Sequence, residues 1–277
     1  MAMQAGIVQQ LSSRVRRLVA PNPGPMTGAG TNTYLIGTDD VAVLDPGPAI
    51  PEHIERVVEA GAGKITRLVC THTHPDHSPA AAVIASRLGV PMIGALTADD
   101  QHQDRSFVPD EQLTDGSLIA GGDWQLRAIA TPGHVDNHFC FLLEEEGMVF
   151  AGDHIMNGST VVIVPPGGNM KAYIASLERL LDFPVSAIAP GHGEIIPDCR
   201  GEVEKLVRHR LMREAKVVAG LRQTGPATLD ELVVVVYNDV DQSLHEWAKL
   251  SMLAHLIKLD EDGQVIEQGG RWRLSLD

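Results

Sequence analysis

Four side chains able to bind a metal lie within six positions of this sequence, directly after an apolar run. The run Ile65–Cys70 is followed by His72, His74, Asp76 and His77. Such a run predicts a buried strand, and the turn that ends it frees the following side chains from the strict alternation of a strand. The four side chains can therefore converge on one point, as metal ligands do. The motif predicts a metal site at the end of a strand.

Three further candidate ligands follow turn-like sequences at the ends of predicted strands. They are His134 after Thr131-Pro132-Gly133, Asp153 after Ala151-Gly152, and His192 after Ala189-Pro190-Gly191. Imidazole and carboxylate ligands suit zinc, and manganese or iron as well. None of these candidate ligands is a cysteine, whose thiolate would favour zinc alone. The residues therefore do not identify the metal.

The length and composition are those of a globular protein with one main domain and a small appendage. The chain has 277 residues, of which 44% are hydrophobic and 21% charged. No apolar run is long enough for a membrane span, and arginines stand at positions 14, 16 and 17, where a signal peptide would be apolar. The three cysteines have no metal-finger or CxxC spacing. We expect a cytoplasmic protein without a disulfide framework or a membrane partner.

The charge balance is strongly acidic. The net charge is −14, which repels phosphate backbones at long range and counts against a nucleic-acid partner without excluding a local basic groove. Bound divalent cations would offset part of this charge.

Up to about Pro190, short β-rich runs alternate with helix-like segments. The strand candidates are Tyr34–Gly37, Val41–Asp45, Ile65–Thr71, Trp124–Thr131, His138–Leu143, Met148–Gly152 and Val185–Pro190. The helix candidates are Pro51–Ala60, Ser78–Leu88 and Met170–Leu181, the last with Asn169 as its cap. This order predicts sheets covered by helices, in a domain of residues 1–200.

The sequence pattern changes after Asp198, where helix-like segments become predominant. Residues 201–277 are predicted to form a second domain. Helices are expected over Glu202–Leu221, over Leu229–Tyr237 behind Thr228, and over Leu244–Leu259 behind Ser243; a hairpin of Gln264–Glu267 and Arg271–Leu276 follows. This pattern predicts a winged-helix-like module. Its third helix has only two lysines among many apolar residues, which favours core packing, substrate gating or dimer contact over DNA binding.

The order HxHxDH, TPGH, GD and PGHG resembles the metallo-β-lactamase superfamily over roughly residues 14–200. The resemblance implies an α/β fold, the four-layer αβ/βα sandwich, with two divalent metal ions, zinc first and manganese or iron as alternatives. The implied ligands are His72, His74 and His134 for one ion, Asp76, His77 and His192 for the other, and Asp153 as a bridge. Asp76 and Asp153 are the expected catalytic residues, with Asp76 also orienting the nucleophile.

Two differences between this sequence and known subfamilies of the superfamily count against membership in those subfamilies. Class B β-lactamases usually have a cysteine at the position of Asp153, and flavodiiron proteins have a glutamate that Thr73-His74 does not match. A closer similarity is to the lactamase beta-like protein 2 group, which has a winged-helix-like tail. It rests on Asn22-Pro23-Gly24-Pro25, Gly30-Thr31-Asn32-Thr33-Tyr34-Leu35, Asp45-Pro46-Gly47, Leu142-Leu143-Glu144-Glu145-Glu146 and Leu244-His245-Glu246.

The leading functional hypothesis is a dinuclear hydrolase that uses a metal-bridging hydroxide on a small ester, thioester, lactone or amide. The first alternative, a single-strand endoribonuclease with RNA as partner, is weakened by Thr73 and Pro75, where RNA-cutting relatives tend to have Trp and Arg. The second is a non-enzymatic nucleic-acid-binding regulator acting through the tail. A homodimer is expected only because dimers are the commonest oligomers of soluble proteins.

Several residues near the motifs allow two interpretations. Asp45 either accepts a hydrogen bond from a ligand histidine or belongs to an ordinary Asp-Pro-Gly turn. Asn32 and Tyr34 are expected in a turn and a packed strand rather than facing substrate. His138 and His154 are expected at the surface or behind the ligands, ahead of a role as proton donor.

Overall fold

The computed structural model describes residues 3–97 and 102–275, and the chain forms two compact units. The first unit consists of the chain up to Thr131, Asn137–Val161 and Phe183–Cys199. The second consists of Pro132–Asp136, Val162–Asp182 and the chain from Arg200 onward. The division into domains 1–200 and 201–277 stays a prediction. No helix in the described part of the chain is long and apolar enough to cross a bilayer.

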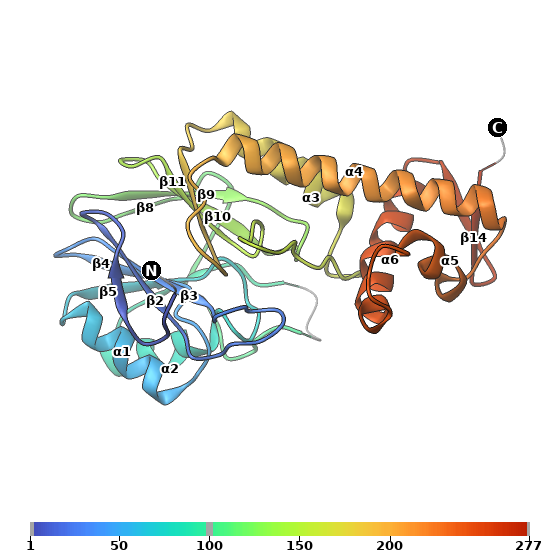
Figure 1. The fold of residues 1–277 in the computed structure, drawn as a ribbon. Helices are drawn as coiled ribbons and strands as arrows, with labels where there is room; N and C mark the ends of the chain where they lie inside the picture. Colours follow the sequence, from blue (N-terminus) through green and yellow to red (C-terminus); the bar gives the residue numbers. More distant parts are fainter. Residues whose placement is uncertain (1–2, 98–101, 276–277) are drawn as a thin grey trace. The chain divides into compact units, whose positions relative to one another are not determined.

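Two β-sheets form the frame of the first unit (Figure 1). The first sheet has the order β1-β2-β3-β4-β5-β6-β7, with bounds Val8–Gln10, Val15–Val19, Asn32–Ile36, Val41–Leu44, Ile65–Val69, Met92–Gly94 and Glu111–Gln112. The second has the order β12-β11-β10-β9-β8, with bounds Ala187–Pro190, Met148–Gly152, Phe139–Leu143, Gln125–Ala130 and Leu118–Ala120. Both sheets are mixed, because β4-β5-β6-β7 and β11-β12 pair in parallel and the other neighbours pair antiparallel.

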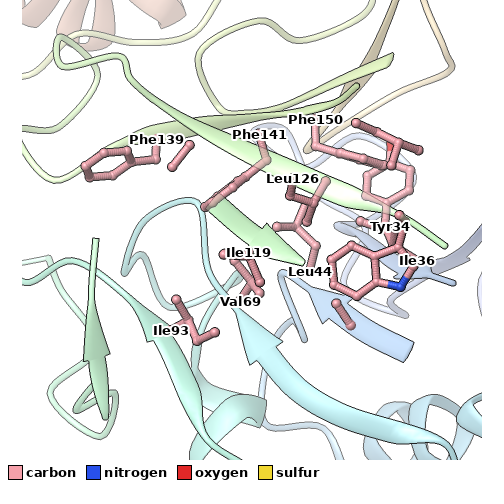
Figure 2. Packing of buried hydrophobic residues seen from close by; sticks show 14 of the residues in the cluster. Tyr34, Ile36, Leu44, Val69, Ile93, Ile119, Leu126, Phe139, Phe141 and Phe150 are labelled. Carbon is pink, nitrogen blue, oxygen red and sulfur yellow. The ribbon is translucent and has the colours of Figure 1, made fainter. Parts of the chain in front are cut away.

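Strand β4, in the middle of the first sheet, is buried on both faces, which explains its continuous apolar sequence. In β4, Ala42 and Leu44 face the second sheet, whereas Val41 and Val43 face helices α1 (Pro51–Gly61) and α2 (Pro79–Leu88). Figure 2 shows the core between the sheets, where side chains of β3, β4, β5 and β6 meet those of β8, β9, β10 and β11. The predicted arrangement, sheets covered by helices, is confirmed as a mixed α/β sandwich.

The second unit contains α3 (Met170–Arg179) with a 3-10 turn at Leu180–Asp182, and the C-terminal module. The module has α4 (Cys199–Thr224), α5 (Leu229–Val236), α6 (His245–Glu261) and a hairpin of β13 (Val265–Gln268) with β14 (Arg271–Leu274). Its own core joins α4, α5, α6 and the hairpin, from Val217 to Trp272. Three helices and a two-stranded wing confirm the predicted winged-helix-like module.

Of the predicted helix caps in the second unit, Asn169 and Thr228 are confirmed and Ser243 is not. The Asn169 side chain accepts a hydrogen bond from the Ala172 backbone, and Thr228 forms a capping box with Glu231, as their types suggest. The prediction for Ser243 is wrong: its hydroxyl and backbone N–H bond to Asp241, which caps a 3-10 turn ahead of α6. The predicted last strand ends at Leu274, and Leu276 lies outside the described residues.

Candidate metal centre

The first ligand motif lies in the loop between β5 and α2, and Asp45 holds the start of that loop. Asp45 follows β4 with a φ of 48° and is buried. Its carboxylate accepts hydrogen bonds from the Thr71 backbone N–H at 2.7 Å and from the Thr71 hydroxyl at 2.8 Å. Because Asp45 N–H also donates to the Val69 carbonyl, the ends of two parallel strands are tied together where the motif begins.

Asp45 also orients a candidate ligand. Its Oδ2 atom lies 2.9 Å from His77 Nδ1, so the first of the two interpretations of Asp45 agrees with the structure. An acceptor at Nδ1 fixes the proton there and leaves Nε2 free for a metal. His77 is fully buried, and its Nε2 faces the carboxylates of Asp76 and Asp153 at 3.4 and 3.2 Å.

Within the first unit, six of the seven predicted ligands come together. The ligand atoms of His72, His74 and Asp153 lie within 4.8 Å of one another, and so do those of Asp76, His77 and His192.

Asp153 approaches the second of these groups as well. Its Oδ1 lies 3.2 Å from both His77 Nε2 and His192 Nε2, while Asp76 Oδ2 lies 3.4 and 3.2 Å from the same two nitrogens. The Asp153 carboxylate therefore lies close to candidate ligands of both groups.

His134 belongs to the second unit. There its Nδ1 lies 3.0 Å from the Val162 carbonyl oxygen, a partner that would leave Nε2 as the ligand atom. Its place in the first ligand set stays a prediction.

The electrostatics of the cluster suit divalent cations. Burial, together with the neighbouring His77 and His74, lowers the pKa of His72 well below its ordinary value, which keeps the imidazole in the neutral form that binds metals. The pKa of Asp76 falls to about 2, because the nearby His77 and His192 outweigh burial. The carboxylates raise the pKa of His192 to about 9 against the effect of burial. Ionised carboxylates in such a buried site need cationic partners, and metal ions can supply that charge.

The loop that carries His192 is held by side chains of the first sheet. Asn32 donates from Nδ2 to the carbonyls of Pro190 and Gly193, each at 2.9 Å, and the Tyr34 hydroxyl donates to Pro190 at 2.8 Å. Arg17, which is 1% exposed, pairs with Glu194 at 2.6 Å. Asn32 and Tyr34 are therefore packed residues, as expected, and they support the loop.

A second support lies behind the first motif. Thr73 is buried between two candidate ligands; its hydroxyl accepts from Asn137 Nδ2 at 2.9 Å and donates to Gln103 Oε1 at 2.5 Å. His138 and His154 are also buried, which excludes the surface interpretation for both, and the His138 ring centroid lies 5.1 Å from that of His72.

Sequence reasoning missed Arg17 and Asn137 as supports of the site. In the sequence, Arg17 argues only against a signal peptide, and Asn137 stands outside every motif. Their partners lie far away in sequence, so no local pattern marks them.

Two family profiles match this chain. That of the metallo-beta-lactamase superfamily matches residues 26–192. That of the beta-lactamase-associated winged helix domain matches residues 228–272.

Curated relatives cover nearly the whole chain. A beta-lactamase-like protein 2 homolog of Caenorhabditis elegans is 32% identical over 267 residues, which cover 93% of this chain and 88% of the relative. An atrochrysone carboxyl ACP thioesterase of Aspergillus chevalieri is 33% identical over 282 residues, which cover 96% and 88%. Among solved structures, a metallo-beta-lactamase family protein of Thermus thermophilus has a TM-score of 0.79 at 25% identity, covering 96% of this chain and 100% of that one.

Proposed function

This chain belongs to the metallo-beta-lactamase superfamily as a hydrolase with a C-terminal winged helix domain, and from that premise we propose that it is a metal-dependent thioesterase. The observation that carries the proposal is the meeting of two His/Asp groups at Asp153. The proposed ligands of one ion are His72, His74 and His134, and those of the other are Asp76, His77 and His192, with Asp153 shared.

Two divalent ions held there would polarise the acyl carbonyl and activate water near neutral pH. We propose zinc first, with manganese and iron as alternatives, because the ligand types suit all three. Asp76 is the least buried carboxylate of the cluster, with a side chain 27% exposed, and Thr31 Oγ1 donates to its Oδ2 at 3.0 Å. This fixed, partly open carboxylate is the group we propose to orient the attacking water.

The chemistry of the leaving group favours a thioester over the ester, lactone and amide alternatives. A thiol has a pKa of about 8.5, so a thiolate leaves without first receiving a proton, unlike an alkoxide or an amine. The histidines nearest the cluster outside the ligand set, His138 and His154, are buried. Of the four substrate types, a thioester therefore depends least on a proton donor for its leaving group. A relative named as an acyl carrier thioesterase supports the same choice.

The endoribonuclease alternative is not supported. The Thr73 side chain is only 2% exposed, and its hydroxyl bonds to Asn137 and Gln103. The Thr73 side chain therefore stabilises the loop and is not available to contact a nucleotide. The homodimer and the cytoplasmic location stay predictions.

The test is thioester hydrolysis by protein of measured metal content. Acyl-N-acetylcysteamine and acyl-CoA substrates of several chain lengths are followed through the released thiol, with Asp153→Asn as the site variant. Asp260→Asn, an exposed carboxylate in α6, is the control. We expect turnover by the parent and by Asp260→Asn, and loss of both metal and turnover in Asp153→Asn. A metal-loaded parent that hydrolyses oxygen esters or lactones but no thioester would contradict the proposal.

A further inference from the structure

Helix α4 concentrates positive charge in an acidic protein. Between residues 199 and 224 the sequence has seven lysines or arginines and three acidic residues, whereas the whole chain has a net charge of −14. Long-range repulsion keeps acidic partners away from most of such a protein, so a locally basic element is where an acidic partner can approach.

One face of α4 combines these charges with exposed apolar side chains. Leu211 is 46% exposed and Met212 is 61% exposed. Arg208 precedes them by three and four positions, and Arg222 follows Leu211 by three helical turns, so all four lie on one side of the helix. Ala215 and Ala219 fill the stretch between Met212 and Arg222, and both are exposed. The face is about 21 Å long from Arg208 to Arg222 at 1.5 Å per residue.

The two terminal arginines of this face are available to a partner. Neither Arg208 nor Arg222 makes an ion pair with any residue that the structure describes. The neighbouring cations are engaged: Lys205 pairs with Glu202 at 3.0 Å, and Lys216 pairs with Asp239 at 2.8 Å.

The acidic groups near this face do not cancel its charge. Glu204 lies at one end, 3.9 Å from Arg200, and Asp239 is shared between Lys216 and Arg213. The face therefore presents an apolar centre between two free positive charges.

We propose that this face of α4, formed by Arg208, Leu211, Met212 and Arg222, docks an acidic helical carrier protein that presents the acyl thioester on a flexible arm. The inference rests on the proposed thioesterase function and names the partner that delivers its substrate. Exposed Met and Leu supply an adaptable apolar contact, and arginine is enriched at protein interfaces. The cations on either side would select for an acidic partner and speed its encounter.

The composition of the face distinguishes a protein partner from RNA. Single-stranded nucleic acids are bound by grooves that combine many cations with aromatic side chains on which bases stack. The α4 sequence has no Phe, Tyr or Trp, and two of the positions at the centre of the face are alanine. Apolar side chains between separated charges suit an amphipathic helix better.

The experiment measures binding first and catalysis second. Full-length, metal-loaded protein is titrated into a fluorescently labelled acyl carrier protein bearing an octanoyl-phosphopantetheine arm, at low and at high salt. The test variant is Arg208→Glu/Arg222→Glu. The control is Arg56→Glu/Arg87→Glu, which makes the same charge change at exposed arginines of α1 and α2. Met212→Gln removes the apolar contact without changing the charge.

We expect the test variant to weaken binding by at least about tenfold, or 1.4 kcal/mol, with the control near the parent. Added salt should weaken parental binding, because the contact is electrostatic. Equal affinity of parent, test variant and Met212→Gln would overturn the docking surface. RNA binding that is lost in the test variant, with no binding of the carrier, would overturn the choice of partner.

Hydrolysis of octanoyl-N-acetylcysteamine separates this inference from the proposed function. We expect the test variant to keep the parental kcat/KM on this small thioester and to lose kcat/KM on the carrier-bound one. A parent that binds the carrier but cleaves neither thioester would contradict the thioesterase and leave the docking surface standing. Normal cleavage of both thioesters by the test variant would contradict the docking surface alone.

Discussion

At the scale of single residues, the structure makes Asp45 the main support of a candidate ligand. Asp45→Asn keeps the side-chain shape, and asparagine tolerates the positive φ at this position. It removes the charged acceptor of His77 Nδ1. Because such partners typically contribute 10- to 100-fold to metal affinity, we expect about that loss in competition with a chromogenic chelator. Asp260→Asn should behave as the parent, and unchanged affinity in Asp45→Asn would show that His77 needs no such partner.

His53 offers a residue-scale prediction on stability that is independent of the metal cluster. It is 1% exposed, and burial lowers its pKa to about 4, while the Pro46 carbonyl acts in the opposite direction. Since the pKa of an unfolded histidine is about 6.5, the unfolded chain binds the proton more readily, and stability is lost as the pH falls from 6.5 to 4. The full loss is about 3 kcal/mol.

The measurement compares urea unfolding of the parent and His53→Gln at several pH values. The titrations of all other groups are common to both proteins and cancel in the difference. We expect the stability advantage of the parent to shrink between pH 6.5 and 4. A difference that stays constant over this range would show that His53 titrates normally in the folded protein.

At the scale of elements, the turn after β12 brings its backbone against the site. A Cβ atom added at Gly191 would lie 2.8 Å from both Asp153 Oδ1 and the Gly152 carbonyl oxygen. Gly191→Ala must therefore displace Asp153 or the end of β11. We expect a loss of about 1–3 kcal/mol in stability and a fall in bound metal. Gly122→Ala, whose Cβ would meet only the Asp40 Cβ at 4.0 Å, is the control; equal metal content in both variants would contradict the expected displacement.

The same elements show how far sequence reasoning reaches. The strands with continuous apolar runs, such as β4 and β10, were predicted because burial on both faces leaves a local signature. β2 was missed because Arg16 and Arg17 interrupt its apolar pattern. The burial of Arg17 depends on Glu194, which is 177 positions away in sequence and which no local pattern connects to it.

For the candidate site, as for the fold, the sequence predicted the local features and not the long-range contacts. Its ligand types and their order along the chain are local facts, and six of them meet in the first unit. The supports of the site are not local. Asn32 and Asn137 act on loops 158 and 64 positions away, respectively, so only the folded chain shows what they hold.

At the scale of the whole molecule, bound cations should contribute to stability as well as to catalysis. The protein has a net charge of −14 and buries Asp153 among histidines. Removing ions from such a site leaves the carboxylates with only histidine as counter-charge, while any ligand that binds the folded state alone stabilises it by mass action. Chelation should therefore lower the melting temperature, and a hundredfold excess of free ion over its Kd should restore about 2.7 kcal/mol.

The identity of the restoring ion and the response of one variant decide whether this stabilisation comes from the proposed site. Zinc, manganese and iron(II) are added back separately to the chelated protein, and the melting temperature and the number of bound ions are measured together. We expect the ion that restores stability to bind with a stoichiometry of two, because Asp153 lies within reach of both His/Asp groups. In Asp153→Asn the shift on chelation should largely disappear. An equal shift in that variant would place the stabilising ions elsewhere on the acidic surface, because only a site that uses Asp153 loses its affinity when that carboxylate is neutralised.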